Sequence, residues 1–210
     1  QSRIHREIRV PGITAILLAA GESSRMGQPK PLLPWGDLPL IQYQVASLAE
    51  AGASPIVVVL GHDSEEIAPY VASSPTLQTV INPDYAEGKT TSIRLGVSQV
   101  RDDVDGVLLL AVDQPRPAEL VRRVIEEHLR SGALITHPTY NGRGGHPIIF
   151  AGSLKSELLA ITEEQQGIRE VVGRHQDSIR TVAVESPIAR VDLNTMGDYE
   201  SALREFGSHS

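Results

Sequence analysis

The stretch Leu17–Lys30, which reads LLAAGESSRMGQPK, constrains the fold of this chain more than any other part of the sequence. An apolar run from Ile13 to Ala20 leads into it, and this run is short and β-branched at its start, which predicts a buried strand. The strand must end at Gly21, because the small and polar residues that follow support neither a long helix nor a long strand. The sequence therefore predicts a buried strand that opens directly into a loop.

This loop has the composition of a polyphosphate-binding site. Small residues let backbone N–H groups approach an anion closely, Arg offers a planar fork for two phosphate oxygens, and Lys places a point charge. The small residues are Gly21, Ser23, Ser24 and Gly27, and the cations are Arg25 and Lys30. The glycines alone are also typical of an ordinary turn. Their spacing fits neither the Gly-x-Gly-x-x-Gly dinucleotide loop nor a Walker P-loop.

Composition narrows the class of protein. The 210 residues are 40% hydrophobic, which suffices for the core of one α/β domain. The net charge of −7 argues against general binding to nucleic acid or to an acidic membrane, because such surfaces attract clustered Lys and Arg. Cysteine is absent, so disulfides, thiolate metal sites and cysteine nucleophiles are excluded. No apolar stretch approaches the roughly 20 residues of a membrane helix, and the first eleven residues lack the apolar region of a secretory signal. We expect a soluble, cytoplasmic protein.

Strand and helix patterns alternate along the chain, which predicts a three-layer α/β/α sandwich around a mostly parallel, Rossmann-like sheet. The predicted strands are 13–20, 55–60, 77–81, 107–112, 133–136, 148–150 and an edge strand at 179–184. The predicted helices are 40–51, 65–72, 88–100, 117–130, 152–159, 165–175 and 196–206. Asp63 or Ser64 can cap the second helix, and Asn141-Gly142 favours a hairpin. We expect one domain at 13–206, an extension at 1–12 that can partly come from an expression vector, and a tail at 207–210.

Asp113 follows the strand Val107–Val112, whose continuous apolar character implies burial on both faces. The carboxyl end of a central parallel strand is where α/β sheets bind ligands. One carboxylate there suits Mg²⁺, which keeps much of its water and takes further oxygens from phosphates. Alternatively, Asp113 caps the helix that begins near Pro117, but four positions separate the two residues and a direct cap is strained. The spacing favours the metal role.

Two other segments have both a structural and a functional interpretation. Gly88-Lys89-Thr90-Thr91-Ser92 opens a helix, so its hydroxyls can cap that helix or its N–H groups can bind an anion. Lysine occurs only at positions 30, 89 and 155, and two of these lie in the proposed nucleotide loops. The turn 141–147 contains Arg143 and His146, which can both donate to an anion, and binding suits His146 better than catalysis.

The motifs together resemble the signature of the nucleotidyltransferases that make sugar nucleotides, cytidine-diphosphate alcohols and molybdopterin dinucleotides. The resemblance rests on Leu-Ala-Ala-Gly, Ser-Arg-Met-Gly and Pro-Lys followed by Pro-Leu-Leu-Pro-Trp-Gly, and it extends over residues 13–203. Within this superfamily the chain is most similar to the molybdenum cofactor cytidylyltransferase family, which shares its Asp-Gln-Pro, Gly-His-Pro and Asp-Leu-Asn-Thr motifs. The resemblance implies a nucleotide-diphospho-sugar transferase fold.

The resemblance also implies a set of site residues, with Arg25, Lys30 and Asp113 as the catalytic group. The implied nucleotide-binding residues are Leu18, Ala19, Ala20, Gly21, Glu22, Ser23, Ser24, Arg25, Lys30, Gly61, Asn82, Gly88, Thr91, Ser92 and Asp113. The implied acceptor-binding residues are Gln114, Pro115, Arg143, Gly144, Gly145, His146, Pro147 and Arg169. Asp113 and Asp192 are the implied metal ligands, for Mg²⁺ or Mn²⁺. The turn that contains Asp192 also caps the last helix through Thr195.

The activity implied by the resemblance is transfer of CMP from CTP to the terminal phosphate of the molybdopterin molybdenum cofactor. The molybdoenzyme that receives the product, or its chaperone, is a further implied partner. A guanylyltransferase that uses GTP on this or another phosphorylated acceptor is a second hypothesis. A carrier that stores or delivers the cofactor without turnover is a third, but a carrier needs neither a triphosphate site nor a metal site.

Overall fold

The structure of the protein, a computed structural model, describes residues 12–23 and 26–207. Predictions for Ser24, Arg25, the extension 1–11 and the tail 208–210 therefore lie outside the described residues. The strands of the main sheet are β1 (Ile13–Ala19), β4 (Ile56–Leu60), β5 (Leu77–Ile81), β6 (Gly106–Ala111), β7 (Ile135–Tyr140), β8 (Arg143–Gly144), β9 (Ile148–Ala151) and β10 (Ile179–Ala183). A small separate hairpin joins β2 (Pro34–Trp35) and β3 (Leu38–Pro39).

The helices follow the strands as the sequence predicts. The α-helices are α1 (Leu40–Glu50), α2 (Ser64–Ile67), α3 (Lys89–Ser98), α4 (Ala118–Ser131), α5 (Lys155–Leu159), α6 (Ile168–Arg174) and α7 (Met196–Phe206). Short 3-10 turns lie at Lys30–Leu32, Ala68–Tyr70, Tyr85–Glu87, Gly152–Leu154, Gln176–Ser178 and Pro187–Arg190. Among the described residues, no helix is both long and apolar enough to cross a membrane.

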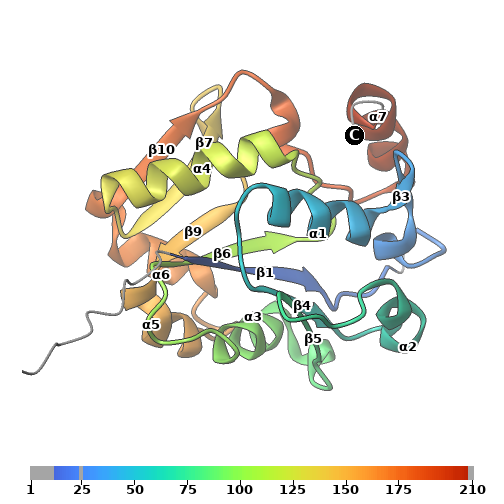
Figure 1. Ribbon diagram of the computed structural model, residues 1–210, viewed down its shortest axis with the longest axis horizontal. Helices are drawn as coiled ribbons and strands as arrows, with labels where there is room; N and C mark the ends of the chain where they lie inside the picture. Colours follow the sequence, from blue (N-terminus) through green and yellow to red (C-terminus); the bar gives the residue numbers. More distant parts are fainter. Residues whose placement is uncertain (1–11, 24–25, 208–210) are drawn as a thin grey trace, which may run out of the picture.

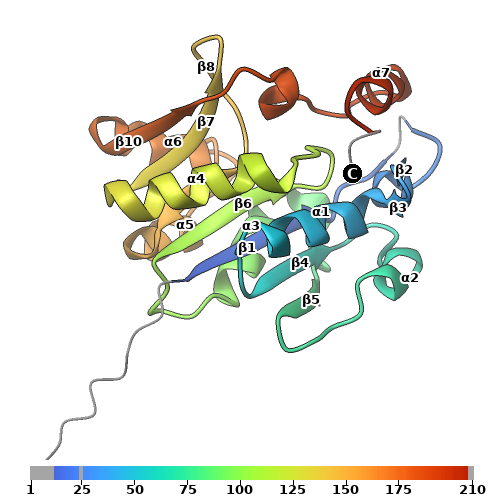
Figure 2. The same ribbon diagram turned by 45° about the horizontal axis from the view of Figure 1, so that its top comes forward.

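The main sheet has the strand order β10-β7-β9-β6-β1-β4-β5, with β8 paired to β7. β1 pairs in parallel with β4 and β6, β4 with β5, and β7 with β10. Only β8 and β9 run antiparallel to their neighbours in this sheet of the described chain, and β9 lies between β6 and β7. The predicted mostly parallel sheet is confirmed, with β10 at its edge. Because β9 is reversed, its amino end lies beside the carboxyl end of β6. Figure 2 shows β6, β1, β4 and β5 side by side in this order.

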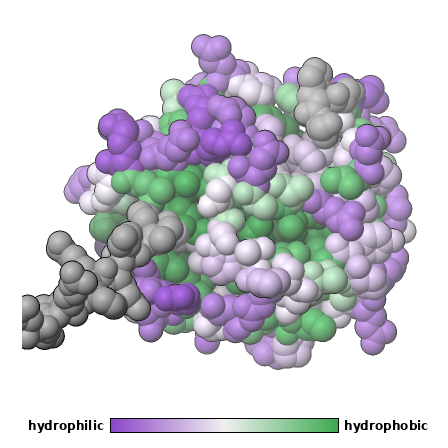
Figure 3. All heavy atoms as spheres, in the orientation of Figure 1, coloured by the Kyte–Doolittle hydropathy of each residue, from purple (hydrophilic) through white to green (hydrophobic). Residues whose placement is uncertain are grey.

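The sheet separates two helix layers, with α1 and α4 on one face and α3, α5 and α6 on the other (Figure 1). Along β1, Leu17 packs into the cluster beneath α1 and α4, whereas Ile16 packs into the cluster beneath α3 and α5. Alternate residues of a strand point to opposite faces. Burial of both faces therefore requires the unbroken apolar run that predicted this strand. Hydrophilic side chains gather on the outer surface of α4, in keeping with its amphipathic sequence (Figure 3).

Several boundaries differ from the prediction, most clearly at the second helix and the fifth strand. The predicted helix 65–72 is only one turn long, because Pro69 lacks the N–H that a longer α-helix needs and a 3-10 turn follows. Neither Asp63 nor Ser64 supplies the expected side-chain cap, and Asp63 itself has a left-handed backbone with φ 55°. The predicted strand 133–136 extends to Tyr140, where Asn141 and Gly142 form the predicted hairpin with positive φ at both positions.

Gly96 sets the distance between α3 and the sheet, which gives a test of the packing. A Cβ at this position would lie 2.5 Å from Ile16 Cγ2 and 3.1 Å from Val59 Cγ2. We expect Gly96→Ala to lower the free energy of unfolding by about 1–3 kcal/mol, because β1 or α3 must move to admit the methyl group. The measurement is the midpoint of urea unfolding.

Gly173→Ala is the matched control, because Gly173 is also helical and has nothing within 4 Å of an added Cβ. We expect this variant to be as stable as the wild type or more stable, by up to about 1 kcal/mol, since alanine favours a helix over glycine. Equal stability of the two variants would contradict the close approach of α3 to β1.

Candidate functional site

An open cleft lies at the carboxyl ends of β1 and β6, where α/β sheets bind their ligands. Many of the residues that line it were predicted to bind nucleotide, namely Leu18, Ala19, Ala20, Gly21, Glu22, Ser23, Lys30, Gly88, Ser92 and Asp113. The others are Pro31, Tyr85, Lys89, Ala111 and Val112. Segments far apart in the sequence thus meet around one opening, which is the arrangement that a ligand with several phosphates requires.

The loop after β1 is anchored at both sides of the uncharacterised pair 24–25. Met26 is 5% exposed and packs into the core, and its N–H donates to the carbonyl of Ser23 at 2.8 Å. The Ser23 hydroxyl accepts from the Lys30 N–H, also at 2.8 Å. This cross-loop bond brings the start and the end of the loop together, so Lys30 is held beside the cleft.

Lys30 and Asp113, two of the three predicted catalytic residues, are in contact. Lys30 Nζ lies 3.3 Å from Asp113 Oδ2, and both side chains remain partly exposed to the cleft. Each charge compensates the other, so neither is left unpaired. The cleft therefore holds a cation that can meet phosphate and a carboxylate that can meet a metal ion, within reach of one ligand.

Three predicted nucleotide-binding residues do not line the cleft but support it. Asn82 is 3% exposed, and its Nδ2 donates to the hydroxyls of Ser92 at 2.8 Å and Thr91 at 2.9 Å. Asn82 thus orients the Ser92 hydroxyl. A Cβ on Gly61 would lie 2.8 Å from the carbonyl oxygen of Ala20, so glycine lets β4 end against the loop.

The amino end of α3 is capped from a distant part of the chain. Thr91 Oγ1 donates to the carbonyl of Gly88, and no hydroxyl of this segment caps the helix, so the alternative of a local cap is wrong. Instead the Thr90 N–H donates to Glu163 Oε1 at 2.6 Å. The Glu163 carboxylate therefore occupies one backbone N–H at the amino end of α3 that could otherwise bind an anion. Lys89, the neighbouring residue, lines the cleft.

Asp113 does not cap the following helix, because α4 begins after Pro117 without any side-chain cap. The Leu193 N–H instead donates to the Asp113 carbonyl at 2.8 Å, so the segment that contains Asp192 lies against Asp113. No group of three or more His, Asp or Glu side chains that could hold a metal ion exists in the described part of the chain. Two carboxylates supplemented by water and phosphate oxygens suit Mg²⁺ or Mn²⁺.

Thr195 caps α7 as predicted, in a reciprocal capping box with Asp198.

The predicted acceptor residues divide into two groups, and none of them lines the cleft. Gln114, Pro115, Gly145, His146 and Pro147 lie together, since Gln114 Nε2 is 3.2 Å from His146 Nδ1. Arg143 and Gly144 lie exposed on β8, and Arg169 lies exposed on α6. Only the first group is therefore joined to the loop that follows Asp113.

The loop that contains His146 is held closely. The His146 N–H donates to the Ala189 carbonyl at 2.9 Å, and a Cβ on Gly145 would lie only 2.2 Å from that same oxygen. Glycine is therefore required at position 145. The close approach explains physically why the Gly-His-Pro motif begins with this residue.

His146 is a neutral imidazole of defined tautomer. Gln114 Oε1 accepts from the Ala111 N–H at 3.2 Å, which directs Gln114 Nε2 to donate to His146 Nδ1. The ring proton therefore resides on Nε2. Burial, and secondarily the Arg116 charge, lower the pKa of His146 to about 4, against the opposing effect of Asp192. At neutral pH the His146 ring can donate one hydrogen bond through Nε2 but adds no positive charge.

Sequence reasoning missed Tyr85 and Arg116. Tyr85 lines the cleft, and its hydroxyl lies 3.2 Å from His62 Nδ1, but an isolated tyrosine after Asn-Pro-Asp has no recognisable signal. Arg116 is completely buried behind the cleft. The only available signal for Arg116 was its position immediately after Asp-Gln-Pro.

Residues 15–179 match the family model described as MobA-like NTP transferase domain. The molybdenum cofactor cytidylyltransferase of Escherichia coli K12 is 28% identical over 197 residues, covering 92% of this chain and 97% of that protein. The nicotine blue oxidoreductase of Paenarthrobacter nicotinovorans is 27% identical over 169 residues, covering 76% and 81%.

Solved structures with a similar fold support the same family. Rv0371c of Mycobacterium tuberculosis H37Rv superposes with a TM-score of 0.81 at 27% identity, over 94% of this chain and all of that chain. Its complex with manganese gives a TM-score of 0.74 at 26% identity, over 92% of this chain and 98% of that chain. The predicted fold, a nucleotide-diphospho-sugar transferase type, is confirmed.

The low pKa of His146 makes stability depend on pH. Below pH 6.5 the unfolded chain takes up a proton on this histidine, whereas the folded chain does so only near pH 4. Protonation therefore favours unfolding as the pH falls from about 6.5 to about 4, at a cost of up to about 3 kcal/mol. We expect the free energy of unfolding of the wild type to fall, over this window, more steeply than that of His146→Asn, whose amide oxygen can still accept from Gln114.

The tautomer can be measured directly. We expect long-range proton–nitrogen NMR correlations to show His146 protonated at Nε2 alone from pH 8 to pH 5. A titration of this ring with a midpoint near 6.5 would contradict both the burial of the ring and the bond from Gln114.

Proposed function

Because this chain belongs to the MobA-like NTP transferase domain family and is a nucleotidyltransferase, we propose that its nucleotide is CTP and its acceptor the terminal phosphate of the molybdopterin molybdenum cofactor. The products are molybdopterin cytosine dinucleotide and pyrophosphate. The name and near full-length coverage of the E. coli relative support this substrate pair, as do the Asp-Gln-Pro and Gly-His-Pro motifs. In this proposal residues 13–206 act as one catalytic domain.

One observation carries the proposal, the contact between Lys30 and Asp113 at the cleft. A triphosphate that enters between the loop 20–30 and the start of α3 meets backbone N–H groups and the Lys30 ammonium. Arg25, outside the described residues, is proposed as a second cation for the phosphates.

The reaction is an in-line attack by a phosphate monoester oxygen on the α-phosphorus of CTP, with pyrophosphate as the leaving group. A phosphate monoester is already largely dianionic at pH 7, since its second pKa is about 6. No general base is needed. The protein must neutralise repulsion between two anions and align them, which is consistent with a sequence that has a cationic loop and carboxylates but no recognisable Ser-His-Asp or Cys-His set.

The family is in general dependent on a divalent metal, and a relative has been solved with manganese. In the proposal, Asp113 and Asp192 hold one Mg²⁺ or Mn²⁺, because the Leu193 bond to Asp113 brings their segments together and water and phosphate complete the ligand set. When bound, the ion offsets the charge that develops on the phosphate oxygens. His146 Nε2–H is free to donate to the acceptor, and Gln114 keeps that proton in place.

Pyrophosphate release tests the proposal. We expect release from CTP with Mg²⁺ or Mn²⁺ that depends on added molybdopterin cofactor and exceeds release from GTP. Asp113→Asn and Lys30→Met should each lower kcat by about 100-fold or more, because each removes a charge that stabilises the transition state. Lys155→Met is the control, since Lys155 bonds Val100 and Asp102 away from the cleft and should leave kcat within about twofold.

Selectivity for GTP would show instead that the same site transfers a guanylyl group rather than a cytidylyl group. Release from neither nucleotide, with a folded protein that binds the cofactor, would instead favour a carrier. Unchanged turnover in Asp113→Asn would contradict the assigned site whatever the nucleotide.

A further inference from the structure

Arg116 is a fully buried cation, with an exposed fraction of 0%. Arginine is almost never buried so completely unless it is paired, because removing a charge from water is costly. It lies between the end of β6 and the start of α4, directly behind the Asp-Gln-Pro turn. Its burial therefore requires compensation by the surrounding loops.

Much of the compensation comes from three carbonyl groups on three loops, while Nη2 has no hydrogen-bond partner among the described residues. Arg116 Nε donates to the His146 carbonyl at 2.8 Å, and Nη1 donates to the carbonyls of Pro115 and Val191, both at 2.9 Å. Pro115 belongs to the turn after Asp113, and Val191 directly precedes Asp192. One planar group thus joins every loop that carries a proposed metal ligand or the buried part of the acceptor set.

The backbone of Arg116 is itself fixed from α1. Its N–H donates to Gln44 Oε1 at 3.2 Å, and its carbonyl accepts from the Ser47 hydroxyl. Gln44 Nε2 also donates to the Gln114 carbonyl at 2.6 Å. The guanidinium therefore extends from a rigid base, and the loops it bonds are positioned relative to the helix layer.

The charge of Arg116 also matches its surroundings. Burial lowers the pKa of the guanidinium to about 10, against the opposing effects of the Asp192 and Asp113 charges, which raise it. Arg116 therefore stays charged at neutral pH. It balances the two carboxylates from the protein side while Lys30 contacts Asp113 from the cleft.

We propose that Arg116 is a positioning residue for nucleotidyl transfer, whose three-way bonding holds Asp192 and the His146 loop in register with Asp113 for one divalent cation. This inference rests on the proposed function. The geometry requires arginine, because a flat fork with donors on separate nitrogens reaches carbonyls in different directions. A lysine keeps the charge but concentrates its donors on one atom.

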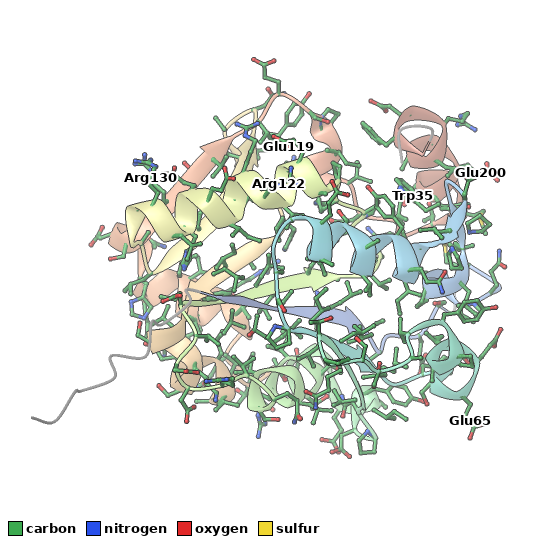
Figure 4. The ribbon with its side chains drawn as sticks, in the orientation of Figure 1. Trp35, Glu65, Glu119, Arg122, Arg130 and Glu200 are labelled. Atoms are coloured by element: carbon green, nitrogen blue, oxygen red, sulfur yellow. The ribbon has the colours of Figure 1, made fainter. Side chains whose placement is uncertain are left out.

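The test compares Arg116→Lys and Arg116→Met with Arg122→Met, a matched control. Arg122 lies on α4, close in sequence, and pairs with Glu119 on the surface at 2.8 Å (Figure 4). The measurements are Mn²⁺ binding to the nucleotide-free protein by electron paramagnetic resonance, KM for CTP, kcat, and urea unfolding to establish the folded fraction.

We expect folded Arg116→Lys to bind Mn²⁺ about tenfold more weakly than the wild type, since residues that orient metal ligands typically contribute 10- to 100-fold to affinity. Its kcat should fall by at least the same factor, while KM for CTP changes less than about twofold because the cleft loops are intact. Arg122→Met should match the wild type in all three quantities.

Wild-type Mn²⁺ affinity in folded Arg116→Lys would overturn the inference and leave Arg116 a purely structural residue. Tighter Mn²⁺ binding by Arg116→Met would also overturn it, since charge repulsion would then outweigh positioning. If Arg116→Met does not fold, Arg116→Lys alone decides. Because Mn²⁺ binding is measured on the nucleotide-free protein, a preference for GTP would contradict the proposed function and leave this result standing.

Discussion

Burial of β1 on both faces, between β4 and β6, is the constraint on which the rest of the structure depends. Because β1 and β6 are parallel neighbours, they end at the same edge of the sheet. The loop after Ala19 therefore begins beside the residues that follow β6. The contact between Lys30 and Asp113 follows from this adjacency. Two charges 83 residues apart in sequence meet because two apolar strands are neighbours, and core packing thereby determines where the chemistry can occur.

The carboxylates at this edge lie between two different cations. Lys30 is partly exposed and can exchange Asp113 for a phosphate or share it with a metal ion, whereas Arg116 is buried and bonded to three carbonyls. The exposed charge belongs to the ligand-binding side and the buried charge to the scaffold. A chain of net charge −7 can thus receive a polyanion, because local pairing rather than overall charge governs the cleft.

Local patterns predicted most of the fold, and they failed where distant segments decide the outcome. Apolar runs located the strands, and the glycine-rich and cationic loop located the cleft, because both depend on neighbouring residues. The cap of α3 comes from Glu163, 73 residues beyond Thr90, and the Val191 carbonyl is 75 residues from Arg116. The bonds from Asn82 to the Thr91 and Ser92 hydroxyls also could not be read from the sequence, since a buried supporting amide and a ligand-binding amide look alike there. One local signal does account for the short α2, because Pro69 lies within the predicted helix 65–72 and cannot continue an α-helix.

The reversal of β9 has a consequence for how such a site can diversify. Its amino end carries the His146 loop to the same edge as Asp113 without a crossover helix, on a hairpin that turns at Asn141 and Gly142. The loop that lines the cleft belongs to a different strand, β1, two positions away in the sheet. Insertions at the hairpin tip can therefore change the surface beside His146 while the strand order and the loop after β1 stay as they are. The loop after β1 and the loop that contains His146 can thus change in length independently of each other on one rigid sheet.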